Sequence, residues 1–267
     1  MPTELKLRGH AKRRSGPYPL GEIPHNVATE IGKHVVHRLA VGHANIGGDD
    51  FGEIFARAIG GTHRNKPLGI ADVVWEGCAW SVKTVQGDGS PKRPVRLISG
   101  RNAPFYSSDI QNPYEDLEAT GKVVLGIWNA RVDESFNEHD DLRIFVMIRN
   151  MTALEFTLME FEAPRFVPAN YYWKLNKRRN LEGYDREGDS HKFTWQPSGS
   201  QFTIFHKVPA SAYRFRINQK PRLLEQQFVL DQIQFRDSWI EPITAISVKD
   251  QVVPSIDEEE ADMFPEV

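Results

Sequence analysis

The sequence predicts an α/β protein in which two helices lead into a β-hairpin and further strands follow. Three observations support this fold class. Apolar residues recur at helical spacing near the N-terminus, a segment rich in Val and Trp is symmetric about Glu76-Gly77, and short apolar segments separated by turn residues continue to Ile217. A chain of 267 residues is long enough to bury a sizeable core, as one large domain or two small ones.

Two amphipathic helices are expected before the hairpin. The first runs from Asn26 to Leu39, where apolar residues recur every three or four positions. The second begins after Asp49-Asp50, because acidic residues favour the N-terminal end of a helix, and it stops at Gly60-Gly61. Each helix therefore has one apolar face to bury.

The hairpin, from Leu68 to Val85, makes a geometric prediction. A two-residue turn at Glu76-Gly77 places Asp72 directly opposite Ser81. Because side chains alternate between the faces of a strand, Ser81 and Lys83 then share a face with Asp72. Glu is not favoured at the left-handed first position of such a turn, so the alternative is a longer turn or a bulge that shifts the register by one.

A carboxylate beside a lysine on one sheet face suits phosphodiester hydrolysis. We expect Asp72 to bind Mg²⁺, which takes oxygen ligands, and Lys83 to neutralise developing charge or help to position the attacking water. Mg²⁺ usually needs a further carboxylate or a substrate phosphate, and Glu53 on the second helix is the expected second ligand. Ser81 is expected to orient the ligands or to bind weakly. Further candidate acids are Glu115, Asp116 and Glu118.

These residues resemble a known family. An acid at the start of a strand, a hairpin, and then acid-X-Lys on the next strand are the hallmark of the PD-(D/E)XK nucleases, which include most type II restriction endonucleases. In this chain the pattern is Ala71-Asp72 followed by Ser81-Val82-Lys83. Ser81 replaces the middle acid and Ala71 replaces the proline, and some restriction enzymes of this superfamily look similar in having Ser-Val-Lys. The resemblance covers Asp49 to Val132.

The resemblance implies a restriction-endonuclease-like fold, with a central mixed β-sheet flanked by helices. It also implies that Asp72 is a metal ligand, that Lys83 is the catalytic lysine, and that Glu53 is the acid that some members donate from the preceding helix. The implied cofactor is Mg²⁺.

The rest of the chain is expected to add strands. A Gly-, Pro- and Lys-rich loop from Gly87 to Pro94 follows the hairpin, then a short helix around Pro113 to Ala119. Strands are expected at four segments, and a helix is expected from Leu223 onward. The predicted strands are Val123 to Val132, Leu142 to Arg149, Phe202 to Phe205 and Tyr213 to Ile217.

The net charge of −3 conceals an uneven distribution. Arg165 to Arg222 holds 12 Lys and Arg against 4 Asp and Glu, whereas Asp250 to Val267 holds 7 acids and no base. A basic, aromatic-rich and β-rich C-terminal half is typical of proteins that bind the phosphates of nucleic acids. The predicted DNA-binding residues are Lys174, Lys177, Arg178, Arg179, Arg214, Arg216, Arg13 and Arg14.

These features divide the chain into a basic N-terminal arm (1–25), a nuclease core (26–150), a DNA-recognition region (151–250) and an acidic disordered tail (251–267). The single cysteine, Cys78, excludes an intramolecular disulfide and a multi-thiolate zinc site. No apolar run is long enough for a membrane helix, so a cytoplasmic location is expected.

The expected function is that of a Mg²⁺-dependent type II restriction endonuclease. Its partner is double-stranded DNA, and it is expected to act as a homodimer because two-fold symmetry matches a palindromic site. The alternatives are a nonspecific or repair DNA nuclease and a non-catalytic DNA-binding protein on a nuclease-like scaffold, which Ser81 favours.

Overall fold

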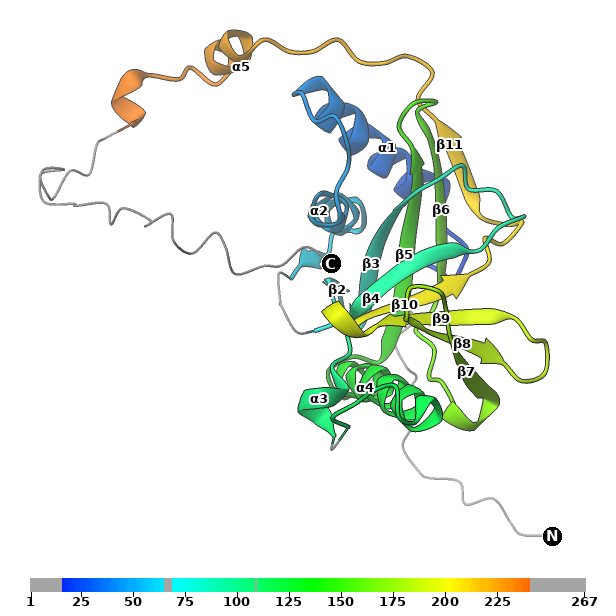
Figure 1. Ribbon diagram of the computed structural model, residues 1–267. Helices are drawn as coiled ribbons and strands as arrows, with labels where there is room; N and C mark the ends of the chain where they lie inside the picture. The colour runs from blue at the N-terminus through cyan, green and yellow to red at the C-terminus, as the bar shows by residue number, and fades with distance from the viewer. Residues whose placement is uncertain (1–15, 65–68, 109, 241–267) are drawn as a thin grey trace, which may run out of the picture. The chain divides into compact units, whose positions relative to one another are not determined.

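The structure, a computed structural model, describes residues 16–64, 69–108 and 110–240 (Figure 1). The chain divides into two compact units, with the boundary after Leu223. The second unit contains α5 (Gln226–Gln232), which confirms the expected helix, and the 3-10 helix η3 (Asp237–Trp239). Arg13, Arg14 and the predicted acidic tail (251–267) lie outside the described residues.

A mixed β-sheet forms the core of the first unit. Its strand order is β1-β2-β3-β5-β6-β11, in which β3 and β5 are parallel and the other neighbours are antiparallel. The strands are β1 (Thr62–His63), β2 (Val73–Trp75), β3 (Cys78–Gln86), β5 (Asp141–Asn150), β6 (Glu155–Glu162) and β11 (Tyr213–Arg216). The expected α/β class with a mixed sheet is confirmed.

Helix α4 (Leu117–Glu138) precedes β5 and lies in the connection from β3 to its parallel neighbour β5. Parallel neighbours require such a crossover, because a tight turn would reverse the chain. The predicted strand from Val123 to Val132 is therefore wrong. Its β-branched residues suggest a strand, but the buried Val124, Trp128 and Val132 recur every four positions, and that spacing produces one buried helix face.

A second, antiparallel sheet has the strand order β4-β10-β9-β8-β7. Its strands are β4 (Val95–Arg101), β7 (Tyr171–Leu175), β8 (Leu181–Asp185), β9 (His191–Gln196) and β10 (Gln201–His206). The short helices between strands are α3 (Pro104–Ser107), η1 (Pro168–Asn170) and η2 (Pro197–Gly199). The halves of the chain on either side of residue 150 are interlocked, because β4 pairs with β10 and β5 pairs with β6.

The two faces of the mixed sheet are covered by different layers. Helices α1 (His25–Ala40) and α2 (Gly48–Ile59), both predicted, pack on the face that carries Trp80 and Phe145. Helix α4 and the second sheet pack on the face that carries Ala79 and Ile144 (Figure 1). Neighbouring residues of β3 thus face different layers. No helix in the described part of the chain is long and apolar enough to cross a membrane.

Candidate functional site

The hairpin has the two-residue turn that its symmetry predicts. Glu76 and Gly77 both have positive φ, 41° and 89°, as this turn type requires. Val73 pairs with Trp80, and the register continues to the turn. The predicted register is confirmed from the Trp75–Cys78 pair to the Val73–Trp80 pair, and the alternative of a longer turn is wrong.

The Asp72 carboxylate lies where the paired part of the hairpin ends. The Asp72 N–H donates to the Trp80 carbonyl oxygen at 2.8 Å, one residue beyond β2. The Val82 N–H then donates to Asp72 Oδ2 at 2.7 Å. The carboxylate thus takes the place of a strand partner for Val82, and this bond holds it beside β3.

Ser81 and Lys83 join this carboxylate, and we call the three residues the Asp72 cluster. Lys83 Nζ lies 3.4 Å from Asp72 Oδ2 and 3.2 Å from the Val82 carbonyl oxygen. Ser81 Oγ donates to the same Asp72 Oδ2 at 3.4 Å. Ser81 is 1% exposed, whereas the Lys83 and Asp72 side chains are 23% and 30% exposed. A ligand in solvent can therefore reach the ion pair.

Glu53, the predicted second ligand, lies on the helix that covers the opposite face of the sheet. Helix α2 packs Phe51 and Phe55 against the face that carries Trp80, with Phe55 and Trp80 ring centroids 5.4 Å apart. Glu53 stands midway between these two phenylalanines, and residues two apart do not share a helix face. The apolar stripe that anchors α2 therefore turns Glu53 away from the sheet.

Two arginines hold the Glu53 carboxylate in that place. Arg57 Nη2 donates to Glu53 Oε1 at 2.6 Å, and Arg38 Nη2 donates to Oε2. Neither bond involves the hairpin. The structure brings Asp72, Ser81 and Lys83 together and does not bring Glu53 to them.

The acids near the start of α4 serve the fold. Asp116 caps the helix, because its Oδ1 accepts from the Ala119 N–H at 2.9 Å. Glu118 accepts from the Trp173 N–H at 3.1 Å and so ties α4 to β7. Among the residues that the structure describes, no group of three or more His, Cys, Asp or Glu is arranged to hold a metal ion.

The donor set of the Asp72 cluster sets a condition on Mg²⁺ binding. Within the described residues, Asp72 Oδ1 has no bonded partner, and the Val82 carbonyl oxygen lies beside the same lysine. Mg²⁺ is commonly held by one or two carboxylates together with substrate phosphates and water. The cluster supplies one carboxylate, the smallest number that commonly holds Mg²⁺, so a phosphate of the substrate would be a further ligand.

Four of the predicted DNA-binding residues gather on the β7–β8 hairpin. Lys174 Nζ lies 4.8 Å from the Tyr172 ring centroid and 5.1 Å from that of Tyr184. The hydrogen bond to Glu182 raises the pKa of Tyr184 to about 12, so this ring stays neutral at physiological pH. Exposed residues at the turn of the hairpin complete this basic edge. They are Lys177, Arg178 and Arg179.

Arg214 and Arg216 alternate with Tyr213 and Phe215 along β11, as the sequence pattern predicts. Arg216 Nε donates to Glu155 Oε1 at 3.0 Å across the strand pair. Arg214 Nη2 donates to the Gly89 carbonyl oxygen at 3.2 Å. Both guanidinium groups therefore make contacts within the protein.

Sequence reasoning missed the role of Val82, whose backbone positions the carboxylate. The only available signal was its place between Ser81 and Lys83 on the predicted strand. Comparison of the chain with protein-family models, with curated proteins and with solved structures gives no match. The functional argument therefore depends on the geometry of the Asp72 cluster.

Proposed function

We propose that this chain is a Mg²⁺-dependent type II restriction endonuclease that hydrolyses phosphodiester bonds of double-stranded DNA at a short specific sequence. The Asp72 cluster carries the proposal, because a carboxylate, a buried hydroxyl and an ammonium meet at one carboxylate oxygen. The arrangement of α2, the β2–β3 hairpin, α4 and the parallel strand β5 also supports the fold that the PD-(D/E)XK resemblance implies.

Each residue of the cluster has a distinct role in this proposal. Asp72 and the substrate phosphate would hold Mg²⁺, which supplies Lewis acidity and a water that deprotonates more readily. The Lys83 ammonium stabilises the negative charge that develops on the phosphate during attack. The Ser81 hydroxyl and the Val82 N–H donate to Asp72 Oδ2 and so fix the orientation of the carboxylate.

Plasmid cleavage tests this proposal. The full-length protein with Mg²⁺ should give discrete fragments, and Lys83→Ala and Asp72→Asn should each lower the rate by about 100-fold or more. Lys122→Ala removes one exposed charge of α4, an element that carries none of the cluster residues, and should cleave normally. A smear would indicate a nonspecific nuclease, and cleavage by Lys83→Ala at the full rate would refute the site.

We also propose that the active form is a homodimer, because a two-fold axis matches a palindromic recognition site. Analytical ultracentrifugation of the protein with and without a cleavable duplex measures this state. A monomer that cuts both strands in one binding event would contradict the dimer.

The second candidate function is a non-catalytic DNA-binding protein on the same scaffold. The observation that favours it is that Glu53 bonds to Arg38 and Arg57. The Asp72 cluster then contains one carboxylate instead of the expected two. Plasmid that is retarded in a gel but stays intact with Mg²⁺ would support this function over the endonuclease.

A further inference from the structure

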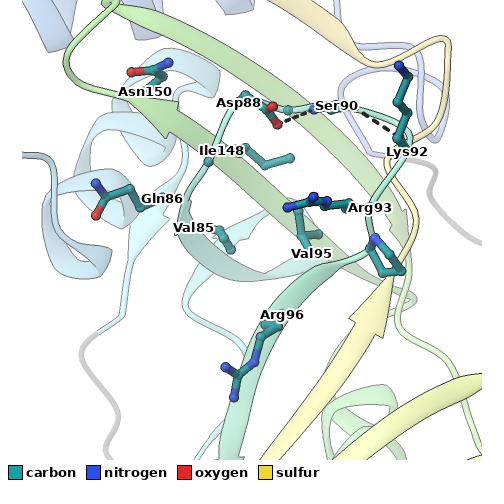
Figure 2. A pocket seen from close by; sticks show the side chains of 13 residues that line it. Val85, Gln86, Asp88, Ser90, Lys92, Arg93, Val95, Arg96, Ile148 and Asn150 are labelled. Atoms are coloured by element: carbon teal, nitrogen blue, oxygen red, sulfur yellow. Dashed lines mark hydrogen bonds between the residues drawn. The ribbon is translucent and has the colours of Figure 1, made fainter.

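A cavity of about 880 Å³ opens at the end of β3, lined by Val85 and Ile148 among others (Figure 2). Val85 follows Lys83 by one same-face step along β3, about 7 Å, and Val85 lines the cavity together with its β5 partner Ile148. The 87–94 loop and the start of β4 form the other walls. We call this cavity the basic cleft.

The basic cleft carries three exposed cations. Lys92, Arg93 and Arg96 are exposed, and no carboxylate within the described residues pairs with any of them. The acid in the lining is Asp88, whose carboxylate accepts the Ser90 N–H at 2.9 Å. The cleft therefore has an excess of positive charge.

The cations do not all point the same way. Arg93 is directed from the loop into the cleft, toward Val85 and Ile148, whereas Arg96 extends from β4 away from these two residues (Figure 2). The Arg96 guanidinium lies 5.9 Å from the Phe205 ring centroid. The Lys92 ammonium points away from the cleft centre in this view. Arg93 is thus the cation directed into the cleft, and Arg96 is an exposed cation at its edge.

The loop that presents Arg93 is fixed against both halves of the sheet. The Gly87 N–H donates to the Arg149 carbonyl oxygen at 3.1 Å, and Arg214 donates to the Gly89 carbonyl oxygen at 3.2 Å. Gly89 has a φ of 66°, and a Cβ there would lie 2.1 Å from Thr157 Oγ1, so only glycine allows this approach. A fixed loop lowers the entropic cost of binding through Arg93.

We propose that the basic cleft binds the sugar-phosphate backbone of the cleaved DNA strand, next to the phosphate that faces Lys83. This inference rests on the proposed function and names where that substrate lies. Val85 of the cleft lies only about 7 Å along β3 from Lys83, so a strand with one phosphate at Lys83 carries neighbouring phosphates close to the cleft. The planar guanidinium of Arg93 can donate two parallel hydrogen bonds to such a phosphate.

Salt-dependent binding tests this assignment without cleavage. Fluorescence anisotropy of a labelled duplex is measured in EDTA over about 50 to 200 mM KCl, since each phosphate contact adds about 0.9 to the slope of log K against log salt. For Arg93→Ala/Arg96→Ala, the slope should fall by about two and the low-salt affinity by about tenfold or more. Circular dichroism and urea unfolding confirm that each variant is folded.

A matched control removes the same charge elsewhere. Lys33→Ala/Lys122→Ala neutralises two exposed lysines, on α1 and α4, and should keep the wild-type slope. Equal slopes for the cleft variant and this control would overturn the assignment. Arg93→Lys keeps the charge, so it should retain the slope while losing part of the affinity that two parallel hydrogen bonds provide.

The two proposals fail in different ways. If wild-type protein does not cleave with Mg²⁺ but the cleft variant still loses slope, the endonuclease proposal fails and the backbone site stands. If cleavage depends on Lys83 while the cleft variant binds with the control slope, the endonuclease proposal stands and the cleft assignment fails.

Discussion

Two carboxylate clusters lie on opposite faces of the same mixed sheet, and their environments differ sharply. The Glu160 side chain is 0% exposed and accepts four hydrogen bonds, whereas that of Asp72 is 30% exposed with one oxygen that has no partner in the described chain. The donors to Glu160 are Tyr18 Oη, Gly21 N, Trp80 Nε1 and Arg143 Nη1. Trp80, which donates to Glu160, and Ser81, which donates to Asp72, are consecutive residues of β3.

The difference separates a structural carboxylate from one that is available for chemistry. Arg143 pairs with both Glu160 and Asp141, and Glu160 and Arg143 together anchor the segment around Tyr18 to the sheet. Burial raises the pKa of Tyr18 and of the nearby Cys78 thiol, so both groups stay neutral at physiological pH. Asp72 accepts its hydrogen bonds on Oδ2, and its side chain is 30% exposed, so the carboxylate is open to an incoming metal and phosphate.

The largest expected effect is on stability at the buried cluster. Glu160→Ala removes one of the two carboxylates that pair with Arg143 and leaves the buried Tyr18 and Trp80 donors without their acceptor. It should lower the free energy of unfolding by about 3–5 kcal/mol. Asp72→Asn keeps an oxygen that accepts from Val82 and should change it by about 1 kcal/mol or less. Urea unfolding measures both, and similar losses for the two variants would contradict the comparison.

A pH series sharpens the same contrast. Burial raises the pKa of Glu160 above its ordinary value of 4.5, although Arg143 acts in the opposite direction. A carboxyl group whose pKa is raised on folding contributes stability that is fully present below the unfolded value and is lost as pH rises through the folded value. Wild-type protein should therefore lose stability relative to Glu160→Gln from acid to neutral pH. If wild-type protein instead gains stability relative to Glu160→Gln as pH rises, the attraction of Arg143 outweighs burial.

The smallest effect is expected at Glu53. Its ion pairs with Arg38 and Arg57 are partly exposed, so Glu53→Gln should change the free energy of unfolding by about 0.2–1 kcal/mol. Plasmid cleavage should change by less than about twofold, because Glu53 does not reach the Asp72 cluster. A 100-fold loss would instead identify Glu53 as a metal ligand, as the family resemblance implies.

The parts of the site that are close in sequence could be predicted. The symmetry about Glu76-Gly77 was sufficient to bring the Asp72 and Ser81 side chains together, because hairpin register depends on local turn length. The two N-terminal helices followed from apolar spacing in the same way. Local pattern was enough wherever the partners lie within one hairpin or one helix.

The rest depends on contacts that are distant in sequence. Tyr18 lies 142 positions from Glu160, and Arg214 lies 125 positions from Gly89, so no local sequence pattern predicts either hydrogen bond. The segment from Val123 to Val132 has residues that favour strands, and only its packing against both sheets decides for a helix. Glu53 was predicted to turn inward because its distance along the chain was short, but the apolar stripe of α2 faces the other layer.

The lengths of the two hairpin strands determine which face of the sheet carries Asp72, Ser81 and Lys83. Side chains alternate along β2 and β3, so one residue added to or removed from β3 before Ser81 would turn Ser81 and Lys83 toward the surface that α1 and α2 cover. The same change in β2 would turn the Asp72 carboxylate toward that surface, among Trp80 and Phe55. Two residues would return it to the original surface, displaced by one pair from Ser81. Length variation in this part of the chain is thus restricted to changes that leave both arms intact.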